Sequence, residues 1–251
     1  MTRREALKYM MLAGLGTLVP WLDLKAADTV DASPLKTDKK RMNDNMKVLL
    51  LNGSPHKEGC TYTALTEIAG ALDKEGVGSE IIHIADKPVS GCMGCGFCRK
   101  SGRCVVDDKV NELIVRLDEF DGFIFGSPVH YASASGFITP FLDRLFYAAS
   151  RKMAYKPGAA VASCRRAGST ATLDQLNKYF TISNMPIVPS QYWNMVHGFT
   201  HDDVRKDEEG LQIMRTLGRN MAWMIKCFGL GKEAGINTPE PEPRISTNFI
   251  K

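Results

Sequence analysis

The chain has 251 residues, of which 44% are hydrophobic, and this fits one sizeable globular domain with extensions at its ends. The net charge is +4, and much of the positive excess lies near the start of the chain. Because the main body carries no basic stripe interleaved with aromatic residues, we expect no nucleic-acid partner. The chain has seven cysteines, an odd number, and four of them lie between positions 92 and 104, which argues against a disulfide scaffold.

Residues 1–27 have the pattern of an export signal. The segment Thr-Arg-Arg-Glu-Ala-Leu-Lys over 2–8 precedes an apolar stretch that is short for a membrane span but suits a signal peptide. This pattern resembles a twin-arginine signal, with Ala6 where that motif usually has Phe. The resemblance implies export to the periplasm, with contact to a membrane only during export. An amphipathic helix or an uncleaved anchor is the alternative, and the protein is cytoplasmic if the leader is not functional.

The rest of the chain divides into a linker, a body and a tail. Residues 28–45 are polar and are predicted to be a linker, and 231–251, with three prolines among charges, are predicted to be an extended tail. The body over 46–230 alternates between strand and helix patterns. Strands are predicted over 47–52, 79–84, 122–126, 159–163 and 187–188, the last with an extension to 192. Helices are predicted over 61–74, 108–118 (capped by Asp107), 136–149, 170–181 and 208–228.

Five strands separated by helices predict an α/β fold, a doubly wound parallel sheet with helices on both faces. In the strand order 2-1-3-4-5, the loops after the first and third strands meet at a topological switch point. Ligands of such sheets bind there, beyond the carboxyl ends of the strands.

The first of these loops is the most informative segment. An apolar run without alternation over 48–51 predicts a strand covered on both faces, and Gly53, Ser54 and Pro55 end it. The following helix begins near Cys60 or Thr61, so its free N–H groups and positive dipole end form a physical site for a phosphate. The glycine spacing fits neither a dinucleotide fingerprint nor a Walker loop. An ordinary strand–turn–helix is the alternative interpretation.

Two further loops reach the same edge. Gly126-Ser-Pro-Val-His-Tyr131 follows the third strand and offers backbone amides and an aromatic side chain for a flat ring. The loop after the fourth strand brings Arg165, Arg166 and Gly168 to the rim. One loop suited to phosphate and two suited to a planar ring together favour an FMN site.

These loops resemble those of the flavodoxin-like NAD(P)H-dependent FMN reductases, over about residues 46–230. The resemblance implies a flavodoxin-like sheet, FMN as cofactor, NAD(P)H as co-substrate and a homodimer or higher homo-oligomer. Cys60 departs from the family, which often has Asn there. The cofactor-binding residues that the resemblance implies are Ser54, His56, Gly59, Cys60 and Thr61 for the phosphate, and Ser127, Pro128, Val129, His130, Tyr131, Arg165, Arg166 and Gly168 around the ring.

Cys92, Cys95, Cys98 and Cys104 form a C-x2-C-x2-C-x5-C motif in the predicted loop 88–104. Four thiolates at such intervals, with glycines between them, suit a [4Fe–4S] cluster or a zinc ion. The spacing resembles that of the iron–sulfur flavoproteins, which implies a cluster beside FMN that relays single electrons. Zinc, a thiol–disulfide role and a loop that binds nothing are the alternatives. Nearby basic residues would offset the charge of a cluster or form a solvated loop: Arg99, Lys100 and Arg103.

The remaining candidates are interpreted as structural. Cys164 and Cys227 are predicted to be buried, and the Tyr192-Trp193 pair is predicted to lie in the core. His197 and His201 are predicted not to be ligands. The whole pattern predicts an FMN-dependent oxidoreductase that moves electrons from NAD(P)H or another donor to a small-molecule or protein acceptor. A non-enzymatic electron carrier and a zinc-stabilised interaction module are the alternatives.

Overall fold

A computed structural model describes residues 46–243, 245–247 and 249. The predicted leader and linker lie outside these residues. Among the residues described, no helix is both long and apolar enough to cross a membrane.

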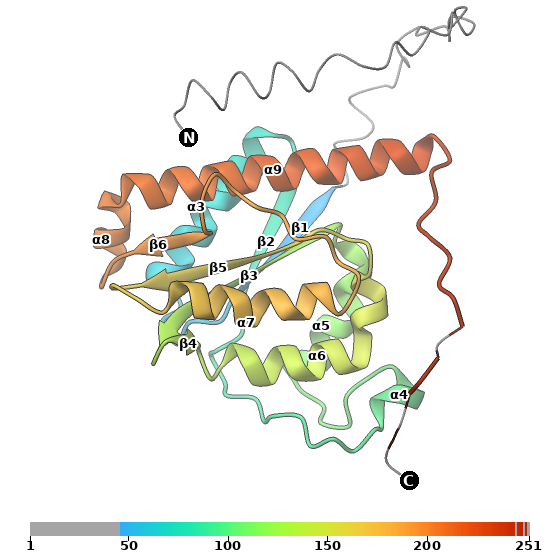
Figure 1. Cartoon of the computed structure of the whole chain (residues 1–251). Coiled ribbons are helices and arrows are strands. Elements are labelled where there is room, and N and C mark those ends of the chain that lie inside the picture. The colour runs from blue at the N-terminus through green and yellow to red at the C-terminus, as the bar shows by residue number, and fades with distance from the viewer. Residues whose placement is uncertain (1–45, 244, 248, 250–251) are drawn as a thin grey trace, which may run out of the picture. The chain divides into compact units, whose positions relative to one another are not determined.

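The body is built on a parallel sheet with the strand order β2-β1-β3-β5-β6 (Figure 1). When these five strands are numbered along the chain, they lie side by side in the predicted order 2-1-3-4-5, so the doubly wound, flavodoxin-like class is confirmed. A short strand that was not predicted, β4, pairs antiparallel with the end of β3. The strands are β1 (Lys47–Asn52), β2 (Gly78–His83), β3 (Gly122–His130), β4 (Ser133–Ala134), β5 (Gly158–Cys164) and β6 (Met195–His197).

Helices cover both faces of the sheet. On one face lie α3 (Cys60–Lys74) and α9 (Glu208–Glu233), which pack against each other (Figure 1). On the other face lie α5 (Lys109–Arg116), α6 (Ile138–Met153) and α7 (Ser169–Thr181). Three short helices complete the described fold: α4 (Cys98–Ser101), η1 (Leu117–Glu119) and α8 (His201–Lys206).

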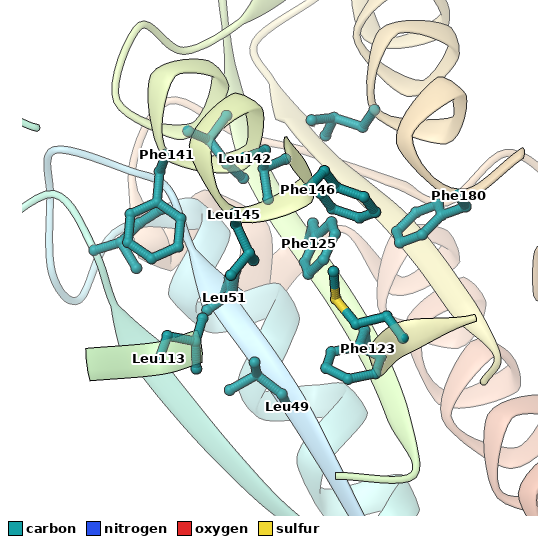
Figure 2. Packing of buried hydrophobic residues seen from close by; sticks show 14 of the residues in the cluster. Leu49, Leu51, Leu113, Phe123, Phe125, Phe141, Leu142, Leu145, Phe146 and Phe180 are labelled. Carbon is teal, nitrogen blue, oxygen red and sulfur yellow. The ribbon is translucent and has the colours of Figure 1, made fainter. Parts of the chain in front are cut away.

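Each face of the sheet has its own core, and β1 contributes to both. Leu49 and Leu51 point toward the α6 side and pack with Phe125 (Figure 2). Val48 and Leu50 belong to the cluster under α3 and α9. Because successive residues of a strand point to opposite faces, the unbroken apolar run is what a strand buried on both sides requires.

The last strand of the sheet is not where the sequence predicted it. Ile187 makes only an isolated bridge with Gly158, and the parallel ladder with β5 forms at Met195–His197 instead. Prolines at 186 and 189 flank the predicted strand, and proline has no N–H to donate to a ladder. Tyr192 and Trp193, predicted to be core, are 51% and 54% exposed and pack edge to face on each other.

Three smaller predictions were also wrong. The cap of α5 is Asp108, whose carboxylate accepts from the Val110 N–H, whereas Asp107 pairs with Arg103. Cys227 is exposed, although Cys164 is buried as expected. Helix α9 runs to Glu233, so the extended tail begins later than 231.

Candidate functional site

The parallel strands end together at one edge of the sheet. Asn52, the last residue of β1, is in register with His83 at the end of β2 and with Gly126 in β3. In the same way β5 ends beside β6. The segments that follow β1, β3 and β5 therefore emerge at the same edge, as the doubly wound topology requires.

Hydrogen bonds from backbone and serine side chains join the first two of these loops. The Gly53 N–H donates to the Gly126 carbonyl at 2.9 Å, and the Ser135 hydroxyl donates to the Gly53 carbonyl at 2.6 Å. The Ser135 N–H in turn donates to Ser127 Oγ at 2.9 Å. A Cβ on Gly53 would lie 2.7 Å from Cβ of Ile138, so no larger residue fits at this turn without movement.

The turn after β1 is organised by Asn52, a residue that the sequence analysis missed. Its side-chain oxygen accepts from the Ser54 N–H at 3.1 Å, and its amide donates to the Lys57 carbonyl at 2.9 Å. Ser54 Oγ accepts from the His56 N–H, while the His56 side chain is exposed. His83 Nε2 lies 2.8 Å from the Ser54 carbonyl. An Asn at the last position of a buried strand is the sequence signal that could have identified this role.

The start of α3 has the features of an anion site. Its N-cap, Gly59, provides no side-chain acceptor, and the first turn contains no acidic residue. Within the part of the chain that the structure describes, the N–H groups of residues 60–62 have no hydrogen-bond acceptor. Such free N–H groups at the positive end of a helix dipole favour a phosphate. These groups are consistent with the phosphate site that the sequence predicts here.

The side chains of Cys60 and Thr61 face inward. Thr61 is fully buried, and its hydroxyl lies 2.8 Å from Ser163 Oγ at the end of β5. Burial raises the pKa of the Cys60 thiol, whose sulfur lies 3.8 Å from the Gly198 carbonyl. Their backbone N–H groups, rather than these side chains, are therefore the donors available at the edge.

The second loop is a tight hairpin between β3 and β4. His130 pairs with Ser133, and the two residues between them have left-handed φ angles, 47° at Tyr131 and 63° at Ala132. This conformation is costly for residues other than glycine and is often found at functional sites. It leaves the Tyr131 side chain fully exposed at the tip.

The third loop packs against this hairpin. Gly168 has a φ of 88°, and a Cβ there would lie 2.7 Å from both Ala132 Cα and Val129 Cγ1. Arg165 and Arg166 are exposed on the same loop. The structure therefore brings the predicted cofactor-binding residues of all three loops to one edge of the sheet.

The four motif cysteines line a second site, a cavity of about 110 Å³. Its wall also contains Arg144 and Tyr147 from α6. Glycines 94, 96 and 102 have left-handed φ angles of 67°, 71° and 67°, which allow the backbone to wrap the cavity. Among the described residues, no three His, Cys, Asp or Glu side chains are grouped closely enough to hold one metal ion. All four thiols are free.

Arg144 is the second important residue that the sequence analysis missed. It is 2% exposed, and its Nε donates to Cys104 Sγ at 3.2 Å. Burial lowers the pKa of its guanidinium, but hydrogen bonds to Asp108 and Cys104 outweigh this, and the net shift is upward. An arginine among the apolar residues of α6 was the available signal.

A larger cavity, of about 670 Å³, lies at the opposite edge of the sheet. It is lined by residues at the strand starts, such as Pro157, and by the last turns of α9, including Phe228. None of the predicted site residues lines it. Its size therefore carries no weight against the carboxyl edge as the candidate site.

Comparison with known proteins identifies the group to which this chain is similar. Residues 46–200 match the NADPH-dependent FMN reductase family. An iron–sulfur flavoprotein of Methanocaldococcus jannaschii is 33% identical over 196 residues, which cover 73% of this chain and 99% of the relative.

Solved structures share the fold at low sequence identity. A flavodoxin from the domain Archaea superposes with a TM-score of 0.51 at 18% identity, covering 72% of this chain and 99% of the other. An NAD(P)H:quinone oxidoreductase from Methanothermobacter marburgensis gives 0.56 at 15% identity, covering 70% and 96%. With the family match over most of the described body, the chain belongs to the NADPH-dependent FMN reductase family of flavin oxidoreductases, and its relatives include iron–sulfur flavoproteins.

Proposed function

We propose that this protein takes electrons from NAD(P)H or another donor at FMN and passes them to an acceptor through a [4Fe–4S] cluster. The observation that carries the flavin part is the uncapped N-terminus of α3, facing the carboxyl edge where two further loops converge. FMN, when bound, supplies the conversion between two-electron and one-electron chemistry. No side chain of this chain needs to act as a general base.

The residues of the three loops have separate roles in this proposal. The N–H groups at residues 60–62 would hold the phosphate, with Ser54 beside them. The hairpin tip, with Tyr131 exposed, would border the ring, and Arg165 and Arg166 would supply positive charge at the rim. The hydrogen bonds between the first two loops would fix the distance between the phosphate and ring positions.

Similarity to iron–sulfur flavoproteins favours a cluster over zinc. The four cysteines line one cavity, and four thiolates can bind either a zinc ion or the four irons of a [4Fe–4S] cluster. The relative in Methanocaldococcus jannaschii is named an iron–sulfur flavoprotein.

Anaerobic mixing with NADPH tests the proposed reaction. We expect the flavin absorbance of the purified protein to fall after mixing, because NADPH reduces the flavin. Persistent absorbance with NADPH and NADH, but bleaching with dithionite, would instead identify a non-enzymatic electron carrier. A flavin-free protein from cells with adequate flavin would contradict the proposal altogether.

Two further parts of the proposal concern assembly and location. We propose a homodimer or higher homo-oligomer, which light scattering of the purified protein tests by its mass. We also propose export through the leader over 1–27, and fractionation of cells that carry the full chain tests it. A monomer, or a protein that stays in the cytoplasm, would remove the respective part without affecting the flavin site.

A further inference from the structure

The cavity of the four cysteines is built around a buried arginine from a distant part of the chain. Arg144 lies on α6, 40 residues after Cys104, and is 2% exposed. A guanidinium has five N–H donors, and every nitrogen of Arg144 is used. Its Nε donates to Cys104 Sγ at 3.2 Å, and its two Nη atoms donate to Asp108 at 2.7 and 2.8 Å.

The remaining hydrogen bonds of Arg144 join the two flanks of the cysteine segment. One Nη donates to the Ser90 carbonyl at 3.3 Å, before the first cysteine, and the other donates to the Val106 carbonyl at 2.9 Å, after the last. The segment between them contains little regular structure, only the single turn of α4. Arg144 therefore fixes where this segment begins and ends relative to α6.

We propose that Arg144 is a positioning residue that closes the cysteine loop around its cluster and raises the cluster's reduction potential through the hydrogen bond to Cys104. This inference rests on the proposed cluster. The reason for the sign is electrostatic: reduction adds a negative charge, and a buried positive charge that donates to a ligand sulfur stabilises the reduced form more than the oxidised form. Asp108 opposes this effect, because its carboxylate partly neutralises the guanidinium.

Arg103 provides a matched comparison. It also carries a positive charge and is the immediate neighbour of Cys104, but its side chain is 54% exposed and pairs with Asp107 in solvent. Water screens exposed charges strongly, so its influence on the cluster should be small. If every positive charge near the motif raised the reduction potential equally, loss of Arg103 and loss of Arg144 would lower that potential by the same amount.

The test is a redox titration of the anaerobically purified full-length protein, with the cluster followed by electron paramagnetic resonance. We expect the midpoint potential to fall in the order wild type, Arg144→Lys, Arg144→Gln, and the iron content of Arg144→Gln to fall as well. Arg103→Gln should stay at the wild-type potential. Asp108→Asn, which keeps a good helix cap, should shift the potential upward. Circular dichroism and FMN content establish that each variant is folded.

A merely structural role for Arg144 would change iron content but leave the potential of the retained clusters unchanged, and that result would overturn the inference. So would equal shifts for Arg144→Gln and Arg103→Gln, or a downward shift for Asp108→Asn. If Arg144→Gln does not fold, the midpoint potentials of the other proteins decide: Arg144→Lys should lie below the wild type and Asp108→Asn above it. A folded wild-type protein with FMN but no iron would refute the proposed cluster itself, and is thereby distinguished from a failure of Arg144 alone.

Discussion

The carboxyl edge of the sheet and the cysteine loop are held in place in different ways. At the edge, neighbouring strands end in register, so the loops that follow them lie side by side. These loops also form hydrogen bonds between backbone groups, such as the Gly53 N–H and the Gly126 carbonyl. The cysteine loop has little regular structure and is held from outside, by Arg144 of α6 and Asn111 of α5. The sheet brings its loops together and buried side chains such as Asn52 and Ser135 complete their turns, whereas the cysteine loop depends on side chains from neighbouring helices.

The largest expected effect comes from removing the external support of the cysteine loop. Arg144→Met removes the ion-pair partner of Asp108 and the donor to the Ser90 carbonyl, and breaking such a buried pair costs about 3–5 kcal/mol. We expect the free energy of unfolding in urea to fall by this amount.

Arg151→Met on the same helix is the control. Arg151 is exposed, and a surface substitution should change stability by no more than about 0.5 kcal/mol. Equal stability of the two variants would show that Arg144 does not support the loop.

A smaller effect is expected at the second support of this loop. The Asn111 side chain accepts from the Cys104 N–H at 2.8 Å and donates to the Cys104 and Val106 carbonyls at 3.0 and 3.2 Å. Asn111→Ala leaves the N–H and the carbonyl of Cys104 unpaired, whereas Arg144 still donates to the Val106 carbonyl, and the change should cost about 1–3 kcal/mol. Iron content should fall while FMN content stays at the wild-type value, as measured on the same preparation. Loss of FMN without loss of iron would contradict this division between the two regions.

At the carboxyl edge, the matching change is Gly53→Ala. The added Cβ would meet Ile138 at 2.7 Å and the Gly126 carbonyl at 3.1 Å, and such overpacking costs about 1–3 kcal/mol. We expect weaker FMN binding by fluorescence titration, with iron content unchanged.

Gly70→Ala is the control, because this glycine-to-alanine change should raise the stability of the fold rather than lower it. Gly70 lies within α3 with open space around it, so alanine should stabilise the helix by about 0.5–1 kcal/mol. Unchanged FMN affinity in Gly53→Ala would mean that the turn after β1 does not shape the phosphate site.

The smallest effect concerns the sheet far from either site. Hydrogen bonds from Arg116 and Lys47 lower the pKa of Glu80 in β2 to about 2, from 4.5. Because the folded-state pKa is the lower one, this carboxylate stabilises the fold above about pH 4.5, and the contribution is lost as the pH falls toward 2. The three side chains are about one-third exposed, so screening reduces the effect to about 1 kcal/mol.

Urea unfolding of the wild type and of Glu80→Gln at about pH 6 and pH 3 measures this contribution. The difference in stability between the two proteins should shrink at the lower pH. A difference that is independent of pH would contradict the assignment.

The sequence predicted the regular part of the molecule well, because periodicity and burial determine it. The strands over 47–52 and 159–163 are close to β1 and β5, and their order follows from the topology rules. The prediction of the last strand was wrong because it relied on the strand propensity of Ile187 and its neighbour, whereas the flanking prolines prevent a ladder. Strand propensity does not reveal whether the backbone has the N–H donors that a ladder needs.

The candidate site was predicted in part, for a related reason. Cys92 and Ser54 lie in motifs that can be read along the chain, so the sequence predicts them as site residues. Arg144 and Asn52 act through contacts made only in the fold, and neither lies in a motif. A charged residue on an apolar helix face is visible in the sequence, but its partner is not.

The most direct test of the whole account is an assay of FMN, iron and zinc in one anaerobic preparation of the full chain, with its ultraviolet–visible spectrum. The account predicts about one FMN and about four irons per chain, with negligible zinc. Stoichiometric zinc without iron would contradict the cluster, and absence of FMN would contradict the assignment of the carboxyl edge.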